Sequence, residues 1–129
     1  TFPLMGASFI PQGLYAMQPP WLAAFEDTTT IQFNHRLLAY VLSALIVSFA
    51  VTALRSGIAG RARAGVHALL AMLLLQVGLG ISTLLLLVPV PLASAHQAGA
   101  IVLFTCALFV SQALTVRGDR GVAALPAAA

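Results

Sequence analysis

The chain has 129 residues, of which 60% are hydrophobic and only 7% are charged. Soluble domains carry about 25% charged residues, so this composition excludes an ordinary soluble protein and predicts an integral membrane protein whose main partner is the lipid bilayer. The net charge of +3 at pH 7 comes from arginines that flank apolar runs and form no basic stripe, so we expect no nucleic-acid partner.

Residues 1–30 contain no long apolar run. Prolines alternate there with aromatic side chains, among them Trp21 and Phe25. Amphipathic rings settle at the membrane–water interface, so this segment is predicted to be an ordered interfacial loop on the outer side of the membrane. A short interfacial helix is expected around residues 20–26, and threonines 28–30 are candidate helix caps.

Three apolar segments follow, at about residues 31–54, 65–88 and 94–116. Each is long enough to cross a bilayer as a helix, and Ser94 is a candidate N-cap of the third. The prediction is an all-α transmembrane helical bundle with three spans. Because a four-helix bundle is the usual container for a core cofactor, we expect these spans to be part of a four-helix unit, with a further helix before Thr1.

The arginines predict the orientation of the bundle. They gather between the first and second spans and after the third, at positions 55, 61, 63, 117 and 120, whereas residues 1–30 and 89–93 contain no Arg or Lys. Positive residues concentrate on the cytoplasmic side, so residues 117–129 are expected to form a tail in the cytoplasm or the mitochondrial matrix, with residues 121–129 disordered. The N-terminal loop and the turn at 89–93 then lie outside.

His35 and His96 are the strongest candidates for a functional pair. His35 lies 20 residues before Arg55, and His96 lies 21 residues before Arg117, which places each imidazole about 30 Å from the arginine that ends its helix. Both rings are therefore expected at one level, near the outer face of the transmembrane region 31–116. Two level histidines suit the axial positions of a haem iron. They do not by themselves exclude copper, but no Cys or Met shares their level to favour it.

Residues beside the histidines are candidate cofactor contacts. Arg36 could pair with a haem propionate, because its guanidinium fork matches a carboxylate; the alternative is a polar helix end that snorkels into the headgroups. Gly99, one turn after His96, leaves room for a flat macrocycle, or else it marks tight helix packing. Gln32 shares the helix face of His35.

Two other polar side chains are interpreted differently. Gln76 lies near the bilayer centre, where an unpaired amide is costly. It shares a helix face with Gly80 and Thr83, and hydrogen bonding to another helix is favoured over contact with a cofactor. His67 lies near the opposite membrane face with no second histidine at its level, so it is not expected to be a ligand.

Several segments resemble the haem A synthase family, specifically its C-terminal half. They are TFPLMGASFIPQG in the first loop, IQFNHRLLAY at the start of the first span, and QVGLGISTLLLLVPVPLASAHQAGA across the second and third spans. The resemblance covers most of residues 1–115. The pairing of NHRLLAY with LASAHQAGA, about 60 residues apart, is a specific combination.

The resemblance implies an eight-helix, haem-dependent membrane oxidoreductase made of two four-helix halves. The family oxidises the C8 methyl group of haem O to the formyl group of haem A for cytochrome oxidase assembly. His35 and His96 match the axial pair of the C-terminal half, which holds haem b. Gln32 stands where the N-terminal half has a glutamate linked to catalysis, and an amide cannot act as a carboxylate base. This half is therefore expected to hold a cofactor, and no catalytic residue is assigned.

The resemblance also implies a location and partners. The expected membrane is the bacterial plasma membrane, or alternatively the mitochondrial inner membrane, with the haem site on the outer side. Haem O and haem A are the expected substrate and product, haem O synthase and cytochrome oxidase assembly factors are possible protein partners, and a homo-oligomer is possible. Two alternatives stay open: a non-enzymatic bis-histidine cytochrome b subunit that relays electrons, and a degenerate half that serves as a scaffold.

Overall fold

The computed structural model describes the backbone of residues 2–123 and the side chains of residues 2–116. Its elements, in chain order, are a 3-10 helix η1 (Pro20–Leu22), α1 (Ala23–Glu26), α2 (Thr28–Arg55), α3 (Gly60–Leu85) and α4 (Val90–Ala123). Within this part of the chain the only β-type pairing is an isolated bridge between Met5 and Ser8. The predicted all-α fold is confirmed.

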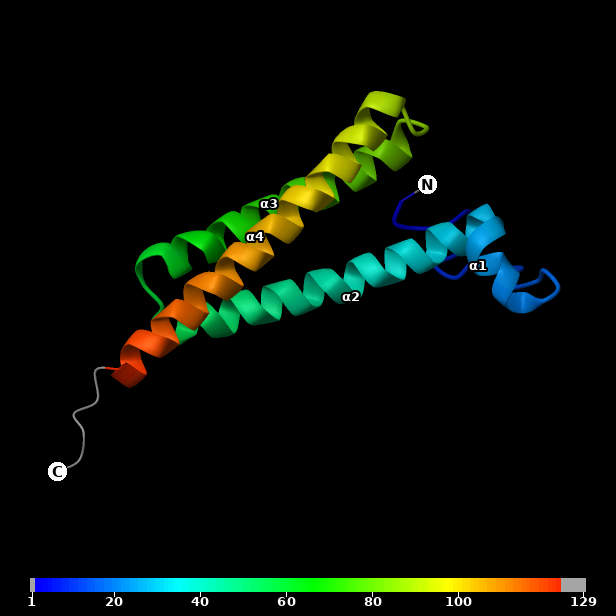
Figure 1. Cartoon of the computed structure of the whole chain (residues 1–129). Helices are drawn as coiled ribbons and strands as arrows, with labels where there is room; N and C mark the ends of the chain where they lie inside the picture. Colours follow the sequence, from blue (N-terminus) through cyan, green and yellow to red (C-terminus); the bar gives the residue numbers. More distant parts are fainter. Residues whose placement is uncertain (1, 124–129) are drawn as a thin grey trace.

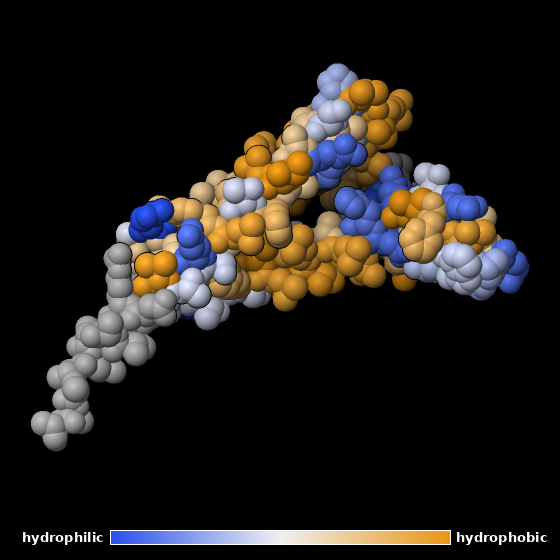
Figure 2. All heavy atoms as spheres, in the orientation of Figure 1, coloured by the Kyte–Doolittle hydropathy of each residue, from blue (hydrophilic) through white to orange (hydrophobic). Residues whose placement is uncertain are grey.

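Three of these helices are membrane spans. The helices Thr28–Arg55 and Gly60–Leu85 and the segment Val90–Val116 of α4 are long and apolar enough to cross a bilayer. Figure 2 shows a hydrophobic middle region with hydrophilic side chains gathered toward the two ends. This is the surface that a lipid environment requires, and the chain is an integral membrane protein.

The first span begins and ends with clear capping features. The side chain of Asp27 caps α2 by accepting a hydrogen bond from the backbone N–H of Thr30. The prediction that the threonines at 28–30 cap this helix is wrong, because they form its first turn and the carboxylate before them takes the N-cap position. After Arg55 the chain turns at Gly57, whose φ of +72° is the left-handed conformation that glycine adopts beyond a helix end.

The ends of α3 and α4 differ from the predicted 65–88 and 94–116. Leu87 and Val88 have φ of +60° and +57°, so α3 ends at Leu85. Pro89 disfavours helical geometry in the residue before it. Pro91 fits the first turn of α4, where a missing N–H costs nothing.

Three smaller predictions are corrected as a result. The second span starts at Gly60, five residues earlier than predicted. Ser94 lies inside α4 and does not cap it. Residues 121–123, predicted to be disordered, belong to this helix, and the predicted disorder of residues 124–129 falls outside the described residues.

The helices α3 and α4 form an antiparallel hairpin, and α2 diverges from it (Figure 1). A Cβ on Gly65 would lie 3.0 Å from both Phe109 and Val110, so this glycine allows close approach of the two hairpin helices. The hydrophobic core comprises Ala50, Ala53, Ile58, Ala62, Val66, Leu69, Leu73, Leu103 and Val110. It joins α2 to the hairpin at the arginine-rich end, so the opposite end stays open between α2 and α4.

The N-terminal segment is fastened to the start of α2. The hydroxyl of Tyr15 donates to Oδ1 of Asn34 at 2.9 Å, and the backbone N–H of Tyr15 donates to the Thr30 hydroxyl at 3.4 Å. The short helix predicted around residues 20–26 is confirmed as η1 followed by α1. Trp21 and Phe25 are 64% and 74% exposed, as a loop at the membrane interface requires.

Candidate functional site

The structure brings His35 of α2 and His96 of α4 together at the open end of the bundle. Their ring centroids lie 6.1 Å apart, and the ring planes are inclined at 79°. In sequence the two residues are about 60 positions apart. Their spacing in the sequence predicted that the two rings lie at the same level. The structure shows in addition that they lie close together, across the opening between α2 and the α3–α4 hairpin.

This separation fits a metal centre between the two rings. One nitrogen of each imidazole bonded to a metal at about 2.0–2.1 Å requires ring centroids roughly 6 Å apart. Nδ1 of His96 is buried and has no hydrogen-bond partner in the described structure. Among the described residues, no group of three or more His, Cys, Asp or Glu side chains gathers to hold a metal ion. Two imidazoles at this separation could supply the two protein ligands of a metal that a macrocycle otherwise holds.

Gly80 of α3 provides the space in which the His96 ring lies. A Cβ on Gly80 would be 2.9 Å from Cε1 of His96 and 3.5 Å from each ring nitrogen. In the sequence, Gly80 shares a helix face with Gln76 and has no visible link to His96. The missing information was the rotation of α3 about its axis relative to α4, which the sequence alone does not specify.

Gln76 holds the backbone at His96. Its side-chain amide donates a hydrogen bond of 2.7 Å to the main-chain carbonyl of His96, and the side chain is 9% exposed. The predicted hydrogen bond to another helix is confirmed, and it ends on the residue that carries the imidazole. Gln76 is therefore a positioning residue, fixing α4 against α3 at the level of the site.

Gly99 is packed against α3. A Cβ on Gly99 would overlap Oε1 of Gln76 and would lie 3.2 Å from Cε of Met72. The expectation that Gly99 leaves room for a macrocycle is therefore wrong, because α3 fills that space. The alternative of tight helix packing describes this residue.

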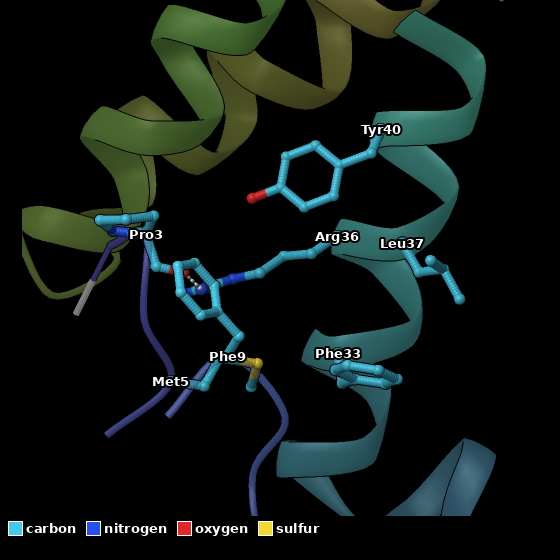
Figure 3. Close-up of a pocket in the computed structure, with 7 residues that line it drawn as sticks. All are labelled: Pro3, Met5, Phe9, Phe33, Arg36, Leu37 and Tyr40. Carbon is cyan, nitrogen blue, oxygen red and sulfur yellow. Dashed lines mark hydrogen bonds between the residues drawn. The ribbon is translucent and has the colours of Figure 1, made fainter. Parts of the chain in front are cut away.

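Arg36 anchors the N-terminal segment to α2. Its guanidinium donates to the main-chain carbonyls of Pro3 and Leu4, each at 3.2 Å, and lies 5.8 Å from the ring centre of Phe2. Figure 3 shows this side chain reaching across from α2 to the loop, with Tyr40 above it. A small pocket of about 60 Å³ surrounds the contact; Pro3, Met5, Phe9, Phe33, Arg36, Leu37 and Tyr40 line it.

Gln32 and His67 have contrasting positions. Gln32 is half-buried, in the second turn of α2, one turn before His35. His67 is exposed near the start of α3, where its Nδ1 lies 2.9 Å from the carbonyl oxygen of Arg63. The structure therefore keeps Gln32 near the histidine pair and places His67 toward the other end of the bundle.

Known proteins resemble this chain over most of its length. The COX15-CtaA family, described as cytochrome oxidase assembly protein, matches residues 1–108. The heme A synthase of Nitrosospira multiformis is 48% identical over 114 residues, covering 88% of this chain and 32% of that protein. The human heme A synthase COX15 is 40% identical over 114 residues, covering 88% of this chain and 28% of that protein.

The chain spans about a third of the length of these relatives. No solved structure gives a significant match. The family match covers both histidines and the loop before them, and it agrees with the motifs at residues 34–40 and 92–100. This chain belongs to the COX15-CtaA family of cytochrome oxidase assembly proteins.

Proposed function

We propose that this chain is the cofactor-holding part of a haem A synthase, in which His35 and His96 are the axial ligands of haem b. The complete protein would oxidise the C8 methyl group of haem O to the formyl group of haem A. The relatives named heme A synthase support this activity. The approach of the two imidazoles to 6.1 Å between centroids is the observation that carries the ligand assignment.

The chain's own residues would fix the geometry of such a site. Gln76 holds the main chain of His96, and Gly80 leaves the space that its ring occupies. His35 lies on α2, on the other side of the opening. Haem b, when bound, would supply one-electron redox chemistry, while the protein sets its ligands, its surroundings and its access to solvent.

Gln32 supports assigning methyl oxidation to another part of the protein. It lies one turn before His35 and carries an amide, which neither accepts a proton as a base nor carries the negative charge of a carboxylate. The role proposed for this part is to relay electrons toward the substrate haem. By the distribution of arginines, the site lies on the outer side of a bacterial plasma membrane or of the mitochondrial inner membrane.

The test of the ligand assignment uses three histidine variants of the full-length protein. His35→Ala and His96→Ala are expected to lower haem b content strongly, because each removes one axial ligand. His67→Ala is the matched control and should keep its haem. Haem b is measured by pyridine haemochrome assay and by the reduced-minus-oxidised spectrum. Loss of haem in the His67 variant with full retention in the other two would refute the assignment.

A second measurement separates the synthase from the alternatives. Full-length protein supplied with haem O, dioxygen and an electron donor should form haem A by two successive hydroxylations and loss of water, and the product is detected by extraction and chromatography. Haem b without haem A formation would indicate a cytochrome b subunit that only relays electrons. A protein that neither binds haem b nor forms haem A would be a structural scaffold.

A further inference from the structure

The end of the molecule away from the histidine pair carries a larger pocket. It has a volume of about 360 Å³ and lies between the start of α3 and the later turns of α4. Its walls are mainly apolar, and its polar side chains are Arg61 and Gln112. The apolar walls include Ala62, Phe109 and Val116. A polar mouth over an apolar wall suits an amphipathic ligand better than a small ion.

Arg61 is held in place at this pocket. Its guanidinium carbon lies 5.5 Å from the ring centre of Phe109, within the range of a cation–π contact. Among the described residues, the contact with Phe109 is the interaction recorded for the Arg61 guanidinium. No described carboxylate forms an ion pair with Arg61. The N–H donors of a guanidinium match the oxygens of a phosphate.

The pocket lies at the boundary between the hydrocarbon and the lipid headgroups. The 26 residues of α3 give a helix about 39 Å long, which exceeds the hydrocarbon thickness of about 30 Å. Arg61 is the second residue of α3, so a centred span places its backbone just outside the hydrocarbon. Its guanidinium, which contacts Phe109, then lies at the boundary between the hydrocarbon and the headgroups. In addition, α3 has no side-chain N-cap, and the N–H groups of its first turn add to the positive potential there.

We propose that this pocket binds an anionic glycerophospholipid, with its phosphate on Arg61 and the glycerol end of its acyl chains against Phe109. The charge of this end supports an anionic lipid: by sequence it carries Arg55, Arg61, Arg63, Arg117 and Arg120 against one carboxylate, Asp119, while Glu26 and Asp27 lie at the other end of α2. Basic pockets between transmembrane helices on the cytoplasmic or matrix side favour such headgroups. A zwitterionic headgroup would bring a second cation toward Arg61 and would bind more weakly.

The test is retention of phosphatidylglycerol by the full-length protein. Delipidated protein in detergent is titrated with dioleoyl phosphatidylglycerol, and bound lipid is counted by native mass spectrometry. Arg61→Ala is expected to weaken retention by roughly tenfold. Arg63→Ala, an exposed arginine that does not line the pocket, should cause a clearly smaller change.

A second variant tests the pocket independently of its charge. Ala59 is exposed, lines the pocket and has an extended backbone with φ of −135° and ψ of 172°, so Ala59→Trp would fill the mouth while keeping Arg61. This variant should also lose phosphatidylglycerol. If Arg61→Ala does not purify as a monodisperse protein, Ala59→Trp decides the question alone.

Three results would overturn the proposal. If Arg61→Ala and Arg63→Ala lose equal amounts of phosphatidylglycerol while Ala59→Trp retains it, the lipid is attracted to the basic surface in general and not to the pocket. Phosphatidylcholine retained as tightly as phosphatidylglycerol would mean an apolar groove with no headgroup preference. Displacement of phosphatidylglycerol by an equal concentration of inorganic phosphate would mean a site for free phosphate.

Discussion

A methyl group on Gly80 would lie 2.9 Å from Cε1 of His96, closer than real side chains approach. The orientation of the His96 ring therefore depends on the absence of a side chain on the neighbouring helix. Since the ring is also the proposed ligand, a one-carbon change on α3 acts on the site without touching either histidine.

We predict that Gly80→Ala lowers haem b content in the full-length protein, while Gly78→Ala leaves it unchanged. A Cβ on Gly78 meets nothing within 4 Å. Both changes favour the helix by a similar amount, roughly 0.5–1 kcal/mol, but overpacking at Gly80 costs about 1–3 kcal/mol or forces the ring to move. Haem per protein is measured by pyridine haemochrome assay. Equal haem content in the two variants would contradict the role given to Gly80.

The orientation of the spans gives a second prediction, based on the arginines. Leu87 in the turn between α3 and α4 is 90% exposed, and Ala59 before α3 is also exposed. In intact cells, Leu87→Cys should react with a membrane-impermeant maleimide and Ala59→Cys should not. Both should react after the membrane is permeabilised, which controls for accessibility. The reverse pattern would place the histidine pair on the cytoplasmic side.

The helices and the histidine pair could be predicted because their signals are local in the sequence. Apolar runs identify each span, and the distance from each histidine to the arginine at the far end of its apolar run fixes its level, although α4 continues past Arg117 to Ala123. The helix ends could not be placed as well. The left-handed conformations of Leu87 and Val88 have no sequence signal of their own, since β-branched and bulky residues rarely adopt them.

The contacts around the site were harder to predict, because several end on main-chain atoms. Arg36 donates to the carbonyls of Pro3 and Leu4, more than 30 residues away, and Gln76 donates to the carbonyl of His96. Every residue has a carbonyl, so no pattern of side chains identifies the acceptor. The sequence indicated that Gln76 needs a hydrogen-bond partner, but the identity of that partner depends on how α3 packs on α4.

The cap of α2 gives a prediction about pH. Hydrogen bonds from the Thr30 hydroxyl and from the Thr30 backbone N–H hold the pKa of the Asp27 carboxyl below its usual 3.8. A lowered folded-state pKa means that the stabilising effect of the cap is present above pH 3.8 and is lost as the pH falls through the folded-state value. Protection of the Thr30 amide against hydrogen exchange should therefore decrease in acid, after correction for intrinsic rates.

The matched variants for this cap are Asp27→Asn and Glu26→Gln. Asp27→Asn should remove the acid dependence at Thr30, since the amide does not titrate in this range. Glu26→Gln, one residue earlier and exposed, should retain it. An unchanged acid dependence in Asp27→Asn would show that another group controls the first turn of α2.

The last prediction concerns Gln32, which lies one turn before His35 on α2. If this part of the protein only holds a cofactor, no proton transfer takes place at this amide. Gln32→Ala should then reduce haem A formation by less than about tenfold, which corresponds to roughly 1.4 kcal/mol in the barrier, and haem b should stay bound because both histidines are intact.

Gln97→Ala, an exposed amide next to His96, is the control for a general loss of helix packing. A general acid or base contributes on the order of 100-fold to 10,000-fold, so the two outcomes are well separated in a turnover assay. A loss of 100-fold or more with an unchanged haem b spectrum would mean that this part of the protein takes part in the oxidation itself, and the assignment of Gln32 to a cofactor-holding half would have to be abandoned.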